Sequence, residues 1–180
     1  MKESIMTVFF TADTHFGSER VLHWSQRPFS TVAQMDDCII ANWNNIVTDQ
    51  DTVYHLGDFG ELDKLSELNG HIIFLPGNDD TPEKVGILAA SCDIINPNTV
   101  ITLEGDDFQL VHEPDEAQPS DNFFLFGHIH KLQMVKRNAL NVGVDCHNFC
   151  PIPLETVLFY RDAILNAYDE NVFLETLAAV

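Results

Sequence analysis

Basic residues are scarce in this chain of 180 residues: nine lysines and arginines stand against 28 aspartates and glutamates, a formal net charge of −19 at pH 7. A field of this sign repels a phosphate backbone, so we expect no tight binding to long nucleic acid. No apolar run approaches the roughly 20 residues of a membrane span. The first residues, Met1–Thr7, lack a secretory signal. We therefore expect a cytoplasmic protein without a membrane partner.

Repeats, low-complexity tracts, a linker and paired Cys-x-x-Cys segments are also absent from the sequence. The length suits one domain with a substantial core, so we predict a single domain over residues 1–180. Among the four cysteines, Cys146 and Cys150 are spaced closely enough for a zinc pair, with His147 between them. We favour the simpler interpretation, in which they are reduced, half-buried loop residues.

Apolar runs that end at turn residues predict seven strands. Several runs are continuously apolar, which is typical of a sheet covered on both faces. The segment Gly105-Asp106-Asp107 predicts a tight hairpin turn between two of the strands. The predicted strands are 5–11, 52–56, 71–75, 99–103, 108–111, 123–126 and 139–142.

Apolar residues three and four positions apart between Val32 and Ile46 predict an amphipathic helix over 32–47. Thr31 and Gln34 resemble a capping box at its start. Strands that alternate with helices favour a layered α/β (α+β) domain with a mixed sheet. Further helices are predicted over 61–68, 82–90, 154–167 and 171–179.

Side chains that can ligate metals follow the ends of five of the apolar runs. The packing of a hydrophobic core does not explain why such side chains recur at the ends of strands. A metal site at one edge of a sheet would explain it. Their mixture of oxygen and nitrogen donors suits Mn, Fe, Zn or Ni better than Ca. The seven donors are Asp13 and His15, Asp58 in Gly57-Asp58, Asn78 in Gly77-Asn78, His112, and His128 and His130 in Gly127-His128-Ile129-His130.

The order D-x-H, GD, GN, H and GHxH resembles the calcineurin-like metallophosphoesterases, binuclear metal enzymes that hydrolyse phosphate esters. The resemblance extends from about Thr7 to about Pro153. The stretches 13–17, 27–29 and 54–59 resemble a small bacterial and phage-type branch. The resemblance implies a two-sheet mixed β-sandwich flanked by helices. It also implies two divalent metal ions, with Mn as our first choice and Fe, Zn, Ni or Mg as alternatives.

The resemblance also implies a role for each donor, in which a hydroxide that bridges the two metals attacks a small phosphorylated substrate. An extended backbone over 128–130 would turn both histidines to one side and Ile129 into the core. Asn78 is in addition a candidate substrate contact. By family role, Asp13, His15 and His130 would bind the first metal, Asn78, His112 and His128 the second, and Asp58 would bridge them.

The third motif departs from the usual Gly-Asn-His-Asp, because Asp79 stands at the position of the histidine thought to protonate the leaving group. With Asp58, Asp79 is our catalytic candidate, yet an ionised carboxylate is a poor proton donor. Its charge would also oppose a dianionic monoester more than a monoanionic diester. We therefore predict a phosphodiesterase. The alternatives are a phosphomonoesterase acting on a nucleotide or phosphoprotein, and a non-catalytic metal-binding interaction scaffold.

Other positions carry weaker predictions. Arg27 is the best candidate for a phosphate contact, with a surface ion pair as an equal alternative. Asp80 and Asp145 are expected to orient ligands through hydrogen bonds. Ser18 stands where this branch often carries histidine. His55 could replace the missing proton donor, although a structural role is favoured. The natural substrate and the oligomeric state stay open.

Overall fold

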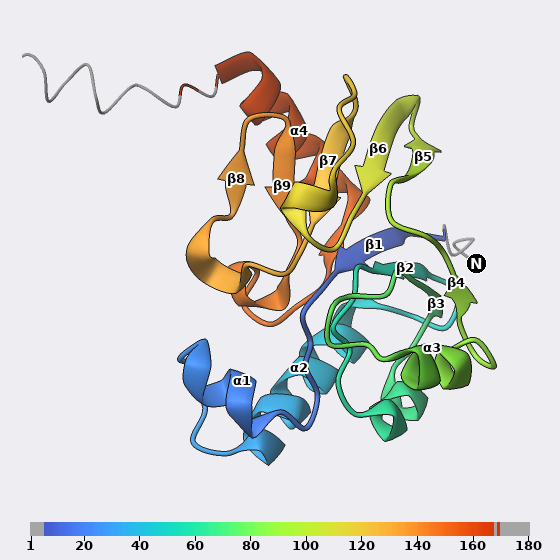
Figure 1. Ribbon diagram of the computed structural model, residues 1–180, viewed down its shortest axis with the longest axis vertical. Helices are drawn as coiled ribbons and strands as arrows, with labels where there is room; N and C mark the ends of the chain where they lie inside the picture. Colours follow the sequence, from blue (N-terminus) through green and yellow to red (C-terminus); the bar gives the residue numbers. More distant parts are fainter. Residues whose placement is uncertain (1–5, 168, 170–180) are drawn as a thin grey trace, which may run out of the picture.

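Two five-stranded sheets form the centre of the computed structural model, which describes residues 6–167 and residue 169 (Figure 1). The first sheet has the strand order β10-β1-β2-β3-β4, and the second has the order β5-β6-β7-β9-β8. The strands are β1 (Val8–Thr11), β2 (Thr52–His55), β3 (His71–Phe74), β4 (Asp93–Ile94), β5 (Thr99–Leu103), β6 (Asp106–Leu110), β7 (Phe123–Phe126), β8 (Val135–Lys136), β9 (Ala139–Asn141) and β10 (Ile152–Pro153).

Both sheets are mixed, as predicted. In the first, β1 to β4 are parallel and β10 pairs antiparallel with β1. In the second, β6, β7 and β9 are parallel, while β5 and β8 pair antiparallel at the two edges. The parallel strands matter for function because their carboxyl ends meet at one edge of each sheet.

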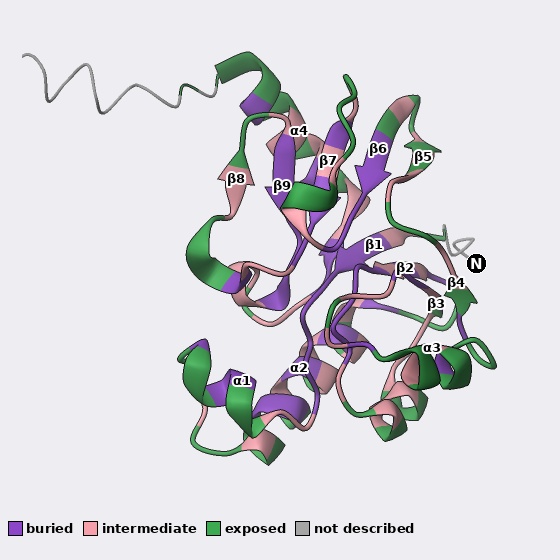
Figure 2. Cartoon of the chain, viewed as in Figure 1, coloured by how far each residue is buried: buried purple, intermediate pink, exposed green. Residues whose placement is uncertain are grey.

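Alternation along β1 shows how the layers are held together. Phe9 packs with Met35, Ile39 and Trp43 of a helix on the outer face of the first sheet. Phe10, the next residue, packs in the core between the two sheets with side chains from β6, β7 and β9. Successive strand residues point to opposite faces, so one apolar run supplies two cores. Figure 2 shows β1 and the central strands as buried.

Helices cover the outer face of the first sheet and one side of the sandwich (Figure 1). Among residues 6–167, no helix is both long and apolar enough to cross a bilayer. The last helix contacts β1, β9 and β10. The helices are α1 (Glu19–Trp24), α2 (Val32–Ile46), α3 (Pro82–Leu88), α4 (Leu154–Ala167) and the 3₁₀ segments η1 (Leu62–Glu67), η2 (Pro114–Glu116), η3 (His130–Leu132) and η4 (Val144–Cys146).

The predicted and observed elements differ in several places, and the short strands β4, β8 and β10 were not predicted. The helix expected over 61–68 is the 3₁₀ segment η1. The hairpin turn lies at Glu104 and Gly105, both with positive φ, so β6 already begins at Asp106. Helix α1 was not predicted, although Ser18 caps it by accepting a hydrogen bond from the Val21 amide. The predicted helix 171–179 lies outside the described residues.

Candidate metal centre

Three of the donor segments leave the first sheet from neighbouring parallel strands. Asp13 follows β1, Asp58 follows β2 and Asn78 follows β3. The Asp13 amide donates to the carbonyl of Gly57 (2.9 Å), and the Asp79 amide donates to Oδ1 of Asp58 (2.8 Å). These bonds tie the three loops into one platform.

The remaining donors come from the second sheet, in which His112 follows β6 and His128 follows β7. The amide of His128 donates to both carboxylate oxygens of Asp13, at 3.0 and 2.9 Å. A bridge between Ala12 and Gly143 joins the sheets at the same point. The two sheet edges therefore meet at Asp13, which brings together segments that lie 115 residues apart.

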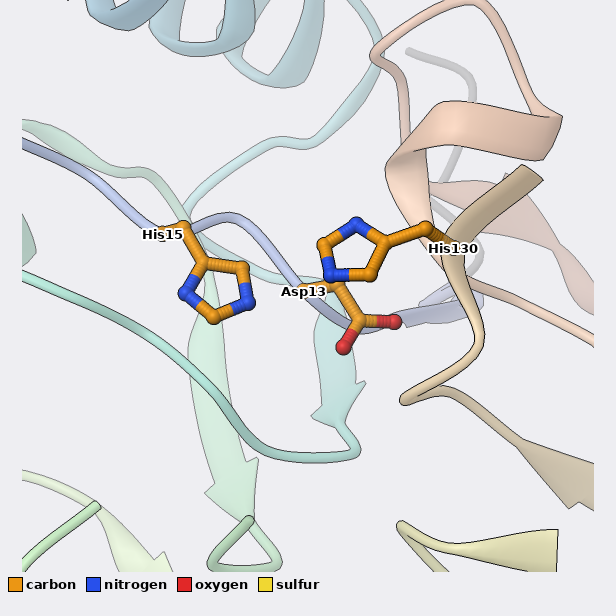
Figure 3. Close-up of side chains that lie close together, drawn as sticks. All are labelled: Asp13, His15 and His130. Atoms are coloured by element: carbon orange, nitrogen blue, oxygen red, sulfur yellow. The ribbon is translucent and has the colours of Figure 1, made fainter. Parts of the chain in front are cut away.

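Asp13, His15 and His130 form a first set of buried donors whose ligand atoms lie within 4.8 Å of one another. Figure 3 shows the three side chains close together, with the Asp13 carboxylate next to the ring of His130. The rings of His15 and His130 are nearly parallel, with an interplanar angle of 15° and centroids 5.2 Å apart.

Asp58 lies between this set and His112. Its Oδ2 is 3.3 Å from Nε2 of His15 and 3.4 Å from Nε2 of His112. With Asp13 and His112, Asp58 forms a second group of buried donors with metal-ligand spacing. One carboxylate thus contacts imidazoles from both sheets, which is the arrangement expected of a bridging ligand.

Asn78 brings the last donors together. Its Oδ1 lies 3.0 Å from Nε2 of His112 and 2.8 Å from Nδ1 of His128. All seven predicted donors therefore converge on one small volume. Because an amide oxygen is a hard, neutral donor, it can complete a cation site without adding charge.

The outward-facing ring nitrogens fix how two of the histidines are protonated. Nδ1 of His112 lies 2.6 Å from the carbonyl of Leu56, and Nδ1 of His130 lies 2.8 Å from Oδ2 of Asp145. Both oxygens can only accept, so each Nδ1 carries a hydrogen and Nε2 is left as the nitrogen that could ligate a cation. A carboxylate or carbonyl behind a histidine is the usual support of a metal ligand. The expected role of Asp145 is consistent with this contact.

Backbone strain is concentrated on the donors. Five of the seven donors have positive φ: Asp13 (57°), His15 (49°), Asp58 (59°), His128 (69°) and His130 (50°). Non-glycine residues rarely adopt this region, and each instance costs on the order of 1–3 kcal/mol. Such strain persists where the surroundings hold side chains in a required geometry.

Glycines make room for the carboxylates. A Cβ at Gly77 would lie 2.4 Å from Oδ1 of Asp58, and one at Gly127 would lie 2.7 Å from Oδ2 of Asp13. At Gly57, where φ is +93°, a Cβ would lie 2.5 Å from the backbone nitrogen of Gly77. Each of these glycines directly precedes a donor, and the close approach at each is possible only because glycine has no Cβ.

The electrostatics of the centre favour positive charge. Burial opposes protonation of His112, but the carboxylates of Asp58 and Asp13 raise its pKa to about 9. Burial alone would raise the pKa of Asp58, yet hydrogen bonding to His112, together with the nearby imidazole of His15, holds that pKa well below its usual range. Burial raises the pKa of Asp13 despite three nearby histidines. The carboxylates of Asp13 and Asp58 are thus buried, and bound cations would stabilise their negative charge.

Divalent cations fit this set of residues. Nε2 of His15 is one of four buried side-chain polar atoms without a hydrogen-bond partner in the described part of the chain, although it points at Asp58. An orphaned buried nitrogen among carboxylates has a cost unless a ligand satisfies it. Mixed carboxylate, imidazole and amide donors are the chemistry that transition-metal ions prefer.

Arg27 does not have the role first expected of it. Its guanidinium has no exposed surface and holds Asp145 through Nε (3.0 Å) and Nη2 (2.7 Å). It also donates to the carbonyls of Thr14 (2.9 Å) and Asp13 (2.6 Å). The prediction of a phosphate contact is therefore wrong for this conformation. Arg27 instead supports the loop that carries Asp13 and His15.

The backbone over 128–130 also differs from the prediction. His128 has a φ of 69°, Ile129 has φ and ψ of −85° and 7°, and His130 begins η3. The segment is a turn rather than extended, so alternation does not explain why both imidazoles face the centre. Their partners do: Asn78 contacts His128, and Asp145 contacts His130.

The two aspartates after Asn78 have different surroundings. The buried carboxylate of Asp80 accepts hydrogen bonds from the amides of Asp58 (2.7 Å), Phe59 (3.2 Å) and Gly77 (2.9 Å), so it fixes two donor loops. Asp79 is partly exposed, and its Oδ2 lies 3.8 Å from Nδ1 of His15. Asp79 therefore faces the centre, where a substrate could meet it.

Three other sequence candidates lie apart from the centre. His55 is buried, contacts Oγ1 of Thr14 at 3.0 Å, and has a pKa that burial lowers to about 3. It is therefore a structural histidine. The thiols of Cys146 and Cys150 point at the carbonyls of His130 (3.3 Å) and Asn42 (3.7 Å), which is not the geometry of a zinc pair.

Two residues that sequence reasoning missed line the cleft over the donors. Arg20 and Trp24 project from α1, and the cleft has a volume of about 160 Å³. Ser18 and Glu19 are a helix-start signal that could have placed α1 here, but nothing in the sequence indicates its distance from the centre.

Comparison with known proteins agrees with this geometry. The sequence model of the calcineurin-like phosphoesterase superfamily domain matches residues 6–148. The uncharacterized protein MJ1445 of Methanocaldococcus jannaschii is 33% identical over 172 residues, which cover 86% of this chain and 91% of that protein.

One solved structure is similar in fold, and a second matches with a lower score. The protein of unknown function AQ665 from Aquifex aeolicus has a TM-score of 0.70 at 20% identity, covering 87% of this chain and 100% of that chain. Pseudomonas putida nuclease MPE has a TM-score of 0.47 at 20% identity, covering 68% of this chain and 61% of that one, a value too low to carry an argument. From the family match over most of its length, the chain belongs to the calcineurin-like phosphoesterase superfamily, whose members use divalent metals to hydrolyse phosphate esters.

Proposed function

We propose that the protein is a binuclear metal-dependent phosphodiesterase that acts on a small phosphorylated substrate. The observation that carries this proposal is the position of Asp58, whose Oδ2 lies 3.3 Å from Nε2 of His15 and 3.4 Å from Nε2 of His112. In this proposal Asp13, His15 and His130 hold one cation, Asn78, His112 and His128 hold the other, and Asp58 is shared.

The donor set favours Mn, with Fe, Zn, Ni or Mg as alternatives. When bound, such a pair of cations supplies Lewis acidity to the phosphoryl oxygens and activates water as a nucleophile near neutral pH. The chain itself contributes orientation. Asp145 and the Leu56 carbonyl hold His130 and His112 in one tautomer, and Asp80 holds the loop of Asp58.

Preference for a diester rests on Asp79. As a carboxylate it accepts hydrogen bonds and has no proton to give to a departing alkoxide. Its carboxylate, 3.8 Å from Nδ1 of His15 and paired with Arg20, adds negative charge at the centre that opposes a dianion more than a monoanion. We therefore expect phosphodiesters with good leaving groups to react fastest.

The test compares two aryl esters. Metal-free protein reloaded with Mn should release p-nitrophenol from bis(p-nitrophenyl) phosphate faster than from p-nitrophenyl phosphate. Asp58→Asn should abolish this activity, whereas Asp121→Asn, a change at an exposed loop residue, should not alter it. Faster monoester turnover would instead indicate a phosphomonoesterase. Tight Mn binding without turnover of either ester would indicate a scaffold.

A further inference from the structure

Helix α1 places two exposed side chains of unlike chemistry over the donors. Arg20 and Trp24 lie one helical turn apart, so they share a face of α1. Both line the cleft that is also lined by His15, Asp58 and His128. In Figure 1, α1 lies near the turn that leads into η3 and carries His130.

Arg20 is the cation of this cleft. Its side chain is 72% exposed and forms an ion pair with Asp79. No other lysine or arginine lines the cleft among the residues that the structure describes. The chain has only nine such residues in all, and the guanidinium of Arg27 is buried. An exposed arginine beside a phosphoesterase centre offers two parallel donors to phosphoryl oxygens.

Trp24 lines the cleft with an aromatic side chain. It is 68% exposed, whereas Trp43 is fully buried. The edge-on contact with His130, at 5.4 Å between centroids and 78° between planes, sets the orientation of the indole. A tryptophan held against a donor histidine but left uncovered provides a flat apolar surface beside the reacting phosphate. Exposed aromatic surface of this kind commonly marks a binding site.

We propose that Arg20 and Trp24 form a substrate subsite, in which Arg20 binds the phosphoryl group and Trp24 stacks on an aromatic ring attached to it. The inference rests on the proposed phosphodiesterase function and narrows its substrate class to nucleoside phosphodiesters, with the base of the nucleoside as the stacked ring. The two positions support these roles: the ion pair with Asp79 holds Arg20 at the centre, and Trp24 packs against the ring of His130.

Substrates that share a leaving group test the stacking. Thymidine 5′-(p-nitrophenyl phosphate) and methyl p-nitrophenyl phosphate release the same phenol but differ in the group that remains. Trp24→Ala should raise KM for the thymidine ester roughly tenfold, the lower range of base stacking on an aromatic side chain. The methyl ester should respond much less, and Trp24→Phe should restore most of the thymidine affinity. Phe159→Ala, at an equally exposed aromatic on α4, is the matched control.

The proposed role of Arg20 predicts a different pattern, in which a substitution affects both esters. Arg20→Gln should lower kcat/KM by roughly tenfold or more for both esters, because both carry the phosphate. Arg20→Lys should recover part of the loss, and Arg137→Gln, at an exposed arginine elsewhere, is the control. Equal effects of Trp24→Ala on both esters, or no effect of Arg20→Gln, would overturn the subsite.

A binding measurement separates this inference from the proposed function. Calorimetric titration of the Mn-loaded protein with thymidine 5′-monophosphate and with deoxyribose 5-phosphate requires no turnover. The subsite predicts tighter binding of the nucleotide, and Trp24→Ala should remove the difference. If all esters resist hydrolysis but this difference is found, the phosphodiesterase proposal fails and the subsite stands. If esters are hydrolysed but the two phosphates bind alike, the subsite fails.

Discussion

Replacing Arg27 tests whether this residue holds the centre together or meets the substrate. Its guanidinium and the carboxylate of Asp145 are 0% and 2% exposed, and they share two hydrogen bonds of 3.0 and 2.7 Å. Arg27→Gln would leave Asp145 buried with His130 alone and would remove donors from two backbone carbonyls. Removing one partner of a buried pair costs about 3–5 kcal/mol. At a urea m-value of about 2 kcal/mol/M, the midpoint should fall by roughly 2 M.

The assay is urea unfolding followed by far-UV circular dichroism in metal-free buffer, since bound metal would add its own stabilisation. Arg137→Gln, which removes an exposed arginine, should leave the midpoint within the error. The double variant Arg27→Gln/Asp145→Asn should lose less than the sum of the single losses, because neither charge is then left unpaired. An unchanged midpoint for Arg27→Gln, together with a raised KM, would refute this reasoning and indicate that Arg27 contacts the substrate.

Three further outcomes are expected. Because burial lowers the pKa of His55 from 6.5 to about 3, the unfolded chain binds more protons than the folded protein below pH 6.5. Between pH 7.5 and pH 5.0, the wild-type protein should therefore lose about 2 kcal/mol more stability than His55→Gln, as measured by urea unfolding. Gly127→Ala, whose Cβ would lie 2.7 Å from Oδ2 of Asp13, should weaken Mn binding roughly 10- to 100-fold in titration calorimetry, whereas Gly86→Ala, with open space around it, should not. Asp79→His should raise turnover of alkyl esters relative to aryl esters; no gain would show that this position takes no part in protonation.

The donors could be predicted from the sequence because their placement follows from strand topology. Asp13, Asp58 and Asn78 each follow an apolar run, and parallel strands bring such ends to one edge. The alternation of Phe9 and Phe10 between two cores was likewise implicit in the pattern of a sheet covered on both faces.

Contacts that depend on loop paths could not be predicted in this way. By residue type alone, Arg27 is equally suited to a phosphate contact and to a surface ion pair, but its ion pair with Asp145 is buried and joins residues 118 positions apart. The backbone of His128 and His130 was expected to be extended, because sequence gives no sign of positive φ at a non-glycine residue. Arg20 and Trp24 were overlooked since the position of the short helix α1 is set by tertiary packing.

Anomalous diffraction at the manganese edge, from crystals grown with Mn, tests the central claim most directly. The account predicts two peaks on either side of the Asp58 carboxylate, roughly 3.5–4 Å apart, each within bonding distance of its own set of histidines. A single peak, or none between His15 and His112, would contradict it.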